Sequence, residues 1–316
     1  MRLSKAVAEF HRGYFATHQR SKHTKQAYAI DLDQFLAWMG KDHSLAALSP
    51  DDLEGWAAEL KRRDYASSSI RRKFATLRVF LNYWVRKGVL ERSPLWMIRL
   101  DLAPQRTLTK VLTVDEMRRL LEEAHRQVIP KDWSKVTEVG SSDRALLSLR
   151  NVALIEVLFA TGMRVGELVA LSLSDYEESE GSFLVHGKGS RQRLAFLPDE
   201  RSRAILAEFR SLRQRLHLSH GKLFANSRGG QLSVCGVGSV LSRLAARSGL
   251  SRRVTPHMLR HTVATLLLRN GANLRVVQEF LGHSSISTTE RYTQVCRGDL
   301  ESALQTYHPN IQGTQL

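Results

Sequence analysis

The sequence predicts a mainly α-helical protein of two domains, a helical bundle followed by a mixed α/β domain that is mostly helical and carries a small antiparallel sheet. Residues 1–99 place apolar side chains at helical spacing only. Residues 97–113 contain a proline and keep no sustained period, which is typical of an interdomain linker. Helical spacing then returns and is interrupted by one alternating stretch that indicates a β-hairpin. We place the boundary near residue 108, which gives domains 1–107 and 108–316.

Three helices of the first domain are predicted from apolar stripes and end signals. Residues 24–40 carry a stripe that stops at Gly40, and the next helix opens with a Ser49-Pro50 cap and an acidic first turn. Residues 67–88 form the third helix. Its apolar face contains Ile70, Phe74, Leu77, Phe80, Leu81 and Trp84.

The second domain opens with a helix over residues 113–127. Thr113 is its predicted N-cap and Glu116 completes a capping box. A strongly apolar helix then runs to Thr161-Gly162. Arg164 and Glu167 follow in an apolar context, where an arginine needs an anionic partner. That partner is either Glu167, one turn away, or a substrate.

The alternating stretch "SFLVHGKGSRQRLAFLP" predicts a small hairpin or three-stranded sheet. Lys188 lies in its turn between two glycines, which allow a ligand close to the backbone, although turn lysines are commonly only solvated. The stretch does not match the phosphate-loop pattern of nucleotide hydrolases.

The pentapeptide "HMLRH" fits two kinds of site. His257 and His261 have the i, i+4 spacing of metal ligands, whereas His257 and Arg260 could bind one anion. A preceding Thr-Pro pair places these residues at a helix N-terminus, which attracts anions. A zinc-protease helix would carry glutamate where Met258 stands, and no third ligand is evident nearby. Phosphate is favoured, and no metal is expected.

A short amphipathic helix that ends at Gly282 precedes His283. Ser287 and Glu290 then form a second capping box, which puts Tyr292 near the start of a new helix. Taken alone, His283 is typical of a histidine that caps a helix C-terminus. Tyr292 alone is typical of a half-buried packing residue.

The chain carries a formal charge of +16 and a pI near 10.3, and both halves are basic. Such a balance favours a nucleic acid partner over a merely well-solvated enzyme. Basic residues of the third helix lie off its apolar face and are expected to contact DNA phosphates, with ordinary solvated charge as the alternative. These residues are Arg71, Arg72, Lys73 and Arg78.

Cysteine content and hydropathy indicate a soluble protein of the reducing cytoplasm. Cys235 and Cys296 are too few for a disulfide framework. No apolar stretch is long enough to cross a bilayer, and the N-terminal residues lack a signal-peptide core.

Five features occur in a fixed order, and together they resemble the catalytic constellation of the tyrosine recombinases, the family of the Xer proteins and phage integrases. They are Arg164 after "ATGM", Lys188 in the hairpin, His257 with Arg260, His283 after "LG", and Tyr292. The resemblance extends to the helical N-terminal domain, which looks like the family's core-binding domain. Residues 126–149 look longer than the family's usual connection, as either an added DNA-contacting loop or a neutral insertion.

The resemblance implies a role for each residue. Tyr292 would be the nucleophile that forms a 3′-phosphotyrosyl DNA intermediate. Arg164, Arg260 and His283 would stabilise the phosphate, His257 would assist as a base, and Lys188 would protonate the leaving 5′-oxygen. Glu167 would orient Arg164. No cofactor, metal or ATP is implied.

The implied activity is site-specific recombination of double-stranded DNA by a homotetramer on synapsed sites, in the cytoplasm at the nucleoid, with a related recombinase or accessory protein as a further partner. A type IB topoisomerase and a non-catalytic DNA-binding regulator remain alternatives. An apolar stripe on the terminal segment 300–307 is expected to dock, either on its own domain or on a neighbouring subunit.

Overall fold

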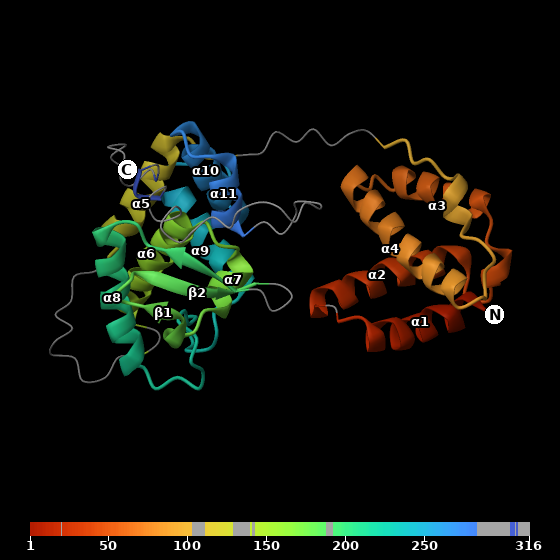
Figure 1. Cartoon of the computed structure of the whole chain (residues 1–316), viewed down its shortest axis with the longest axis horizontal. Helices are drawn as coiled ribbons and strands as arrows, with labels where there is room; N and C mark the ends of the chain where they lie inside the picture. The colour runs from red at the N-terminus through yellow and green to blue at the C-terminus, as the bar shows by residue number, and fades with distance from the viewer. Residues whose placement is uncertain are drawn as a thin grey trace. The chain divides into compact units, whose positions relative to one another are not determined.

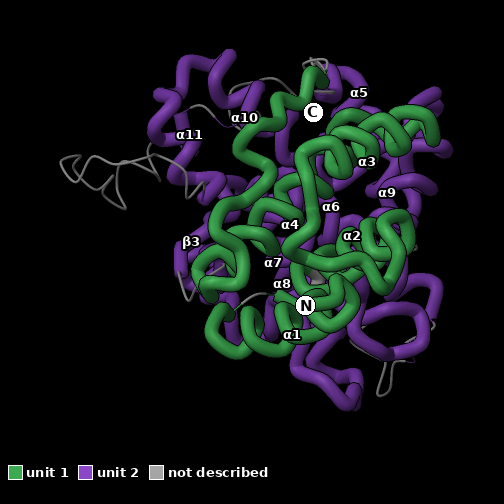
Figure 2. The backbone as a smooth tube through the Cα atoms, turned by 90° about the vertical axis from the view of Figure 1, so that its right-hand side faces the viewer, with its two compact units in different colours: residues 1–107 green, residues 108–316 purple. Residues whose placement is uncertain are grey.

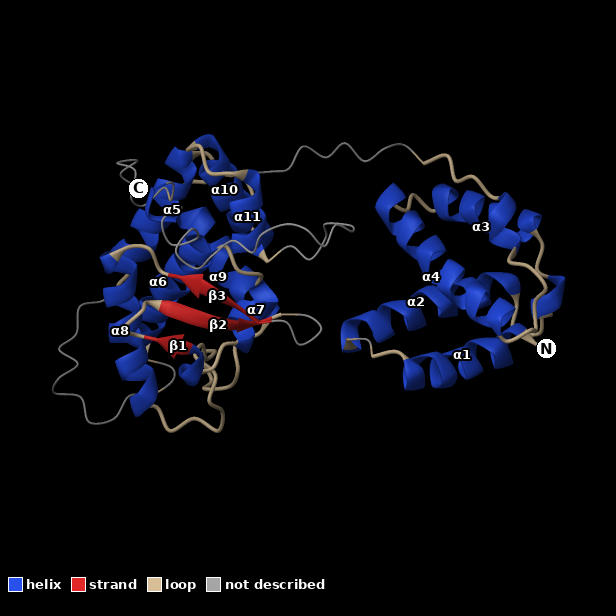
Figure 3. Cartoon of the chain, in the orientation of Figure 1, coloured by secondary structure: helices blue, strands red, loops and turns tan. Residues whose placement is uncertain are grey.

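The computed structural model of the chain forms two compact units, residues 1–107 and residues 108–316 (Figure 2). Both units are helical, and the second also contains a small sheet (Figure 3). The predicted fold class is therefore confirmed. The structure describes residues 1–19, 21–102, 111–128, 140, 143–187, 192–282, 304–306 and 308.

Unit 1 is a bundle of four α-helices with one short 3₁₀ turn between α2 and α3 and another after α4 (Figure 1). Its elements are α1 (Leu3–Thr17), α2 (Lys22–Met39), η1 (Leu45–Ala47), α3 (Pro50–Arg62), α4 (Ser67–Arg86) and η2 (Pro94–Met97). The helix ends follow the signals in the sequence, since Ser49 and Asp52 form a reciprocal capping box and Gly40 ends α2 with a positive φ of 92°. Aromatic residues fill the core, among them Phe10, Phe35, Trp56, Phe74 and Phe80.

Unit 2 packs helices around a three-stranded antiparallel sheet of order β1-β2-β3. Its elements are α5 (Val114–Arg126), α6 (Arg144–Thr161), α7 (Val165–Ala170), η4 (Leu173–Asp175), β1 (Tyr176–Glu177), β2 (Ser182–His186), β3 (Gln192–Phe196), α8 (Glu200–Arg215), α9 (Val234–Arg247), α10 (Pro256–Arg269) and α11 (Leu274–Leu281). Strands β2 and β3 flank the "GKG" turn, so the predicted hairpin is confirmed.

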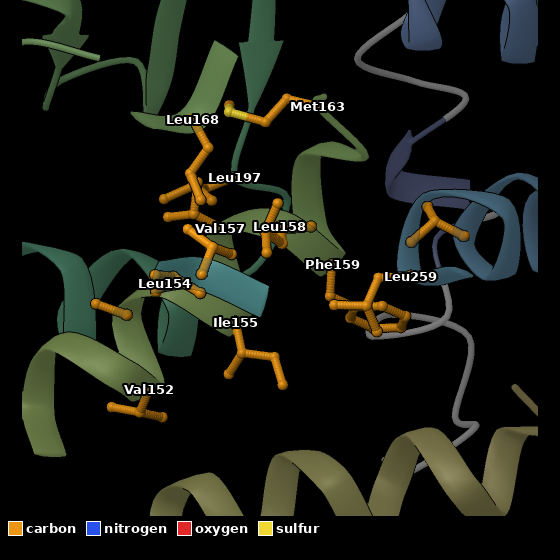
Figure 4. Packing of buried hydrophobic residues seen from close by; sticks show 14 of the residues in the cluster. Val152, Leu154, Ile155, Val157, Leu158, Phe159, Met163, Leu168, Leu197 and Leu259 are labelled. Carbon is orange, nitrogen blue, oxygen red and sulfur yellow. The ribbon is translucent and has the colours of Figure 1, made fainter. Parts of the chain in front are cut away.

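Helix α6 is the centre of unit 2. Every residue from Val152 to Thr161 is buried, and α5, α8 and α10 all pack against this helix. Phe159 of α6 and Leu259 of α10 belong to this core (Figure 4). Because α6 is buried on all sides from Val152 to Thr161, its C-terminal end is held rigidly between other elements.

Helix α6 begins at Arg144, inside the segment 126–149 that the sequence pattern placed before it. Asp143 caps it through hydrogen bonds from the backbone N–H groups of Ala145 and Leu146. The connection from α5 is correspondingly shorter than the expected 126–149 segment. Most of that connection lies outside the described residues.

Part of the C-terminal stripe packs on its own unit. Leu304 is 2% exposed and belongs to the core of unit 2, and the ring of the fully buried His308 lies edge-on to Phe159. In a single chain, this segment therefore docks in cis at these two positions. Within the described part of the chain, none of the helices combines the length and apolar character that a bilayer crossing requires.

Candidate active site

The turn that leaves α6 positions Arg164. Gly162 ends the helix in the left-handed conformation, with φ 54°, and Arg164 becomes the N-cap of α7. Glu167 closes this turn by accepting a 2.8 Å hydrogen bond from the backbone N–H of Arg164. The same carboxylate forms a 3.0 Å ion pair with Nη1 of the Arg164 side chain. The carboxylate is nearly buried, whereas the Arg164 side chain remains 42% exposed. The Arg164 side chain is thus partly accessible to a ligand.

Arg260 ties together the ends of two helices. Its Nη1 donates to the carbonyl of Gly162 at 2.7 Å, and its Nη2 donates to the carbonyl of Leu281 at 2.6 Å. The last carbonyls of a helix lack partners within the helix and carry partial negative charge, so they suit a buried guanidinium. Burial, together with the nearby charge of Arg164, lowers the pKa of Arg260 to about 10, which leaves it protonated at neutral pH.

Gly162 and Gly282, at these two helix ends, leave room for side chains that pack directly against the backbone. A Cβ on Gly162 would lie 2.9 Å from the ring of Phe280, and a Cβ on Gly282 would lie 2.8 Å from the side chain of Arg193. Gly282 also has a positive φ of 62°. Its carbonyl accepts a 3.0 Å hydrogen bond from Nη2 of Arg164. Both arginines therefore bind the turn at the end of α11.

A third arginine completes the cluster. Arg193 of β3 donates from Nη2 to Glu167 at 2.9 Å, and its own side chain is only 14% exposed. Burial would raise the pKa of Glu167, but the charge of Arg193 and the hydrogen bonds from Arg164 hold it below the usual glutamate value. Three guanidinium groups against one carboxylate leave an excess of positive charge, which fits a phosphate.

Helix α10 presents the "HMLRH" residues as the sequence predicts. The side chain of Thr255 accepts the N–H of Met258 at 3.3 Å, and Pro256 occupies the first turn. His257 is exposed there, one turn before Arg260. Across the described residues, no group of three or more His, Cys, Asp or Glu side chains is arranged to hold a metal ion.

Three expected site residues lie outside the described residues, namely Lys188, His283 and Tyr292. The described backbone reaches their sequence neighbours. Strand β2 ends at His186, two residues before Lys188, and Gly282 directly precedes His283. The described part of the candidate site brings together Arg164, Glu167, Arg193 and Arg260. His257 is related to them only by its place one turn before Arg260.

Known protein families match both units of the chain. The model of the Phage integrase family matches residues 110–297, and that of the phage integrase N-terminal SAM-like domain matches residues 7–88. The chain belongs to the phage integrase family of tyrosine recombinases. Tyrosine recombinase XerD of Oceanobacillus iheyensis is 34% identical over 92% of this chain and 93% of the relative. Tyrosine recombinase XerC of Halalkalibacterium halodurans is 35% identical over 92% of each.

The fold of this tyrosine recombinase also resembles a solved structure. A crystal structure of XerH site-specific recombinase, in a post-cleavage complex with its palindromic difH substrate, superposes with a TM-score of 0.66. The match covers 99% of this chain and 82% of XerH, at 22% identity. At this level of identity, the likeness concerns the fold alone.

Arg193 is the residue of the recombinase site that the sequence did not single out. Alternate residues of a strand share a face, and Arg193 shares one with Ala195 and Leu197, which are 1% and 0% exposed. A charged residue on the buried face of a strand was the available signal.

The expected DNA-contacting residues of α4 divide into two groups. Lys73 is 1% exposed and its Nζ lies 3.0 Å from Asp31, so its expected place on the basic face was wrong. Arg72 also pairs with Asp31, although half of its side chain remains exposed. Arg71 donates to the carbonyl of Leu102 at 2.7 Å. Arg71, Arg72 and Arg78 remain exposed on the recombinase surface, whereas Lys73 contributes to the core.

Proposed function

We propose that this enzyme is a site-specific recombinase that cuts and rejoins double-stranded DNA through a 3′-phosphotyrosyl intermediate on Tyr292. The observation that carries the proposal is the attachment of Arg164 and Arg260 to the turn at Leu281 and Gly282. This turn directly precedes His283 in the chain. Two expected phosphate-binding residues thus bind one turn, although they come from distant parts of the sequence.

The arginines supply charge stabilisation. A guanidinium has five N–H donors, and the carbonyl bonds of Arg260 use two of them, so others remain for the non-bridging oxygens of a phosphate. Anchored donors need little reorganisation as negative charge develops in the transition state. This role explains why no divalent metal is required in the proposal.

We assign the remaining chemistry to Tyr292, Lys188, His257 and His283. Tyr292 attacks the phosphorus and releases the 5′-oxygen, which Lys188 protonates. His257 assists as a base at the N-terminus of α10, and His283 adds a donor to the phosphate. Because the phosphotyrosyl link conserves the energy of the broken bond, attack by the 5′-hydroxyl of another strand completes exchange without ATP.

We further propose that four copies act on two synapsed recombination sites, alone or with a related recombinase or accessory protein, in the cytoplasm at the nucleoid. The XerC and XerD relatives are recombinases, and the XerH structure contains recombination-site DNA. Alternation of cutting between subunits would then require contacts that a single chain does not contain.

The test uses supercoiled plasmids with two copies of candidate sites taken from DNA flanking the encoding gene, with chelator present. Recombination predicts two smaller circles, a covalent adduct at one position per strand, and a synaptic complex with the mass of four chains. Relaxation that is independent of the site would indicate a type IB topoisomerase instead. Binding without any adduct would indicate a DNA-binding regulator.

A further inference from the structure

Unit 2 contains a polar cavity of about 670 Å³ that the proposed chemistry does not use. The first turns of α6, the exposed side of α9 and the loop before α9 form its walls. Its charged lining residues are Arg144, Arg150, Arg243 and Arg247. Its polar lining includes Ser148, Asn151, Asn226, Ser227 and Ser239.

The charge of this cavity is not balanced by its own walls. Among the described lining residues there are four arginines and no aspartate or glutamate. Arg247 lies near the carboxylate of Glu123, which also binds Arg126. The other three arginines form no ion pair within the described part of the chain. Such a concave surface raises the local concentration of anions.

Arg150 is the deepest of the four. It is 6% exposed, and its guanidinium donates to the carbonyl of Ala225 at 2.9 Å and to the side-chain oxygen of Asn151 at 2.7 Å. Both partners are neutral. Burial and the positive charge of Arg243 lower the pKa of Arg150 to about 10, so two like charges face one cavity. A bound anion would offset this repulsion.

Arg213 shows what a purely structural buried arginine looks like in this chain. It is 2% exposed and donates to the carbonyls of Lys222 and His220, and a cavity that it lines together with Arg150 has a volume of only about 10 Å³. Arg150 has similar carbonyl bonding but opens onto a cavity large enough for a phosphate group. The cavity and its unbalanced charge, rather than the burial alone, indicate a ligand.

The position of the cavity relates it to the reaction centre. Arg150 and Thr161 lie on the same helix, roughly 16 Å apart at 1.5 Å per residue. Phosphates of one DNA strand recur about every 3.4 Å along the axis, so this distance along α6 corresponds to about five phosphate spacings. Helix α7, which begins beside Arg164, packs against α9.

We propose that this cavity binds a backbone phosphate of the DNA duplex, several nucleotides from the phosphate that reacts. The inference rests on the proposed function, because it takes DNA as the ligand. Phosphate contacts of this kind fix the register of a protein on the duplex without reading its sequence. The cavity would therefore hold the scissile phosphate in register with Arg164 and Arg260.

The test combines Arg243→Gln with a scan of the DNA backbone. Arg243 is exposed, so its replacement leaves the core intact, and Arg201→Gln on the exposed surface of α8 is the matched control. Duplexes with one neutral methylphosphonate at each successive position are titrated by fluorescence anisotropy. We expect Arg243→Gln to weaken duplex binding about tenfold and to reduce the salt slope by about 1. One methylphosphonate position should weaken the wild type and Arg201→Gln but have no further effect on Arg243→Gln.

Three outcomes separate this inference from its alternatives. Independent effects of Arg243→Gln and of the methylphosphonate at every position would overturn it, even if the enzyme cleaves DNA normally. Coupling at one position without any covalent adduct would support the cavity and overturn the proposed recombinase chemistry. Calorimetric binding of inorganic phosphate that Arg243→Gln abolishes, with unchanged duplex binding, would assign the cavity to a free anion and overturn the DNA proposal.

Discussion

Arg193 and Glu167 form an ion pair of 2.9 Å between Nη2 and Oε2, although both side chains are largely buried. The pair connects the sheet to the turn that presents Arg164. Because Glu167 also binds the backbone and guanidinium of Arg164, it holds two positive groups in fixed positions. We therefore expect Glu167 to act by positioning Arg164 rather than by touching DNA.

Glu167→Gln should therefore slow cleavage without weakening DNA binding. Glutamine keeps the size and one acceptor but loses the charge that orients Arg164 and Arg193. We expect the rate of adduct formation at saturating DNA to fall at least tenfold, as for other groups that orient a reacting centre. Glu178→Gln, which removes an exposed ion pair with Arg210, is the control and should leave the rate unchanged. Equal rates for both variants would show that Glu167 has no positioning role.

Lys188 and Arg260 should differ on a substrate whose 5′-bridging oxygen is replaced by sulfur. A thiolate leaves without a proton, so this substrate should largely restore cleavage by Lys188→Ala. The same substrate should not restore cleavage by Arg260→Ala, because that variant lacks charge stabilisation at the non-bridging oxygens. Single-turnover adduct formation gives the comparison, with circular dichroism to establish that both variants fold. Similar rescue of the two variants would contradict the assignment of the general acid.

Substitution of Lys73 in α4 should lower the stability of the protein, whereas substitution of Arg78 should change its DNA binding. Lys73→Met leaves Asp31 buried without one of its two cationic partners, and we expect a loss of about 3 kcal/mol in the free energy of unfolding. Arg78→Gln changes an exposed side chain, so stability should stay within about 0.5 kcal/mol while the salt slope of DNA binding falls by about 1. Urea unfolding and anisotropy titrations measure the two quantities. If Lys73→Met is as stable as the wild type but binds DNA more weakly, Lys73 would belong to the DNA interface instead.

His308 should make docking of the C-terminal segment dependent on pH. Burial lowers its pKa to about 4, which Asp199 offsets only in part, so the folded state favours the neutral ring. The stabilisation is complete above the unfolded pKa of about 6.5 and is lost as the pH falls toward 4, by about 2 kcal/mol at pH 5. Thermal unfolding from pH 7 to pH 5 should show this loss in the wild type and in the exposed control His217→Gln, but not in His308→Phe. A loss of the same size in His308→Phe would assign the pH dependence to other groups.

Local signals account for the parts of this fold that the sequence predicted. The caps at Ser49 and Thr113 and the left-handed glycines Gly162 and Gly282 depend on a few neighbouring residues, and the structure confirms them. For Arg164, the sequence left a choice between Glu167 and a substrate. The structure contains the Glu167 pair and still leaves part of the guanidinium exposed.

The parts that the sequence did not predict depend on distant contacts. Helical spacing puts Lys73 next to the apolar face of α4, but only the fold brings Asp31 to it, 42 residues away. Arg260 bonds to Gly162 across 98 residues of chain, and no periodicity indicates that pairing. Arg193 bonds to Glu167, 26 residues earlier in the chain, and its place on the buried face of a strand does not indicate that partner.

Mass spectrometry of the trapped adduct tests the central claim most directly. After digestion of the DNA and of the protein with trypsin, a nucleotide remnant should lie on the peptide of residues 292–297, attached to Tyr292. Tyr292→Phe removes only the hydroxyl and should bind the site with unchanged affinity while forming no adduct. An adduct that persists in Tyr292→Phe, or a remnant on the peptide that contains Tyr307, would contradict the account.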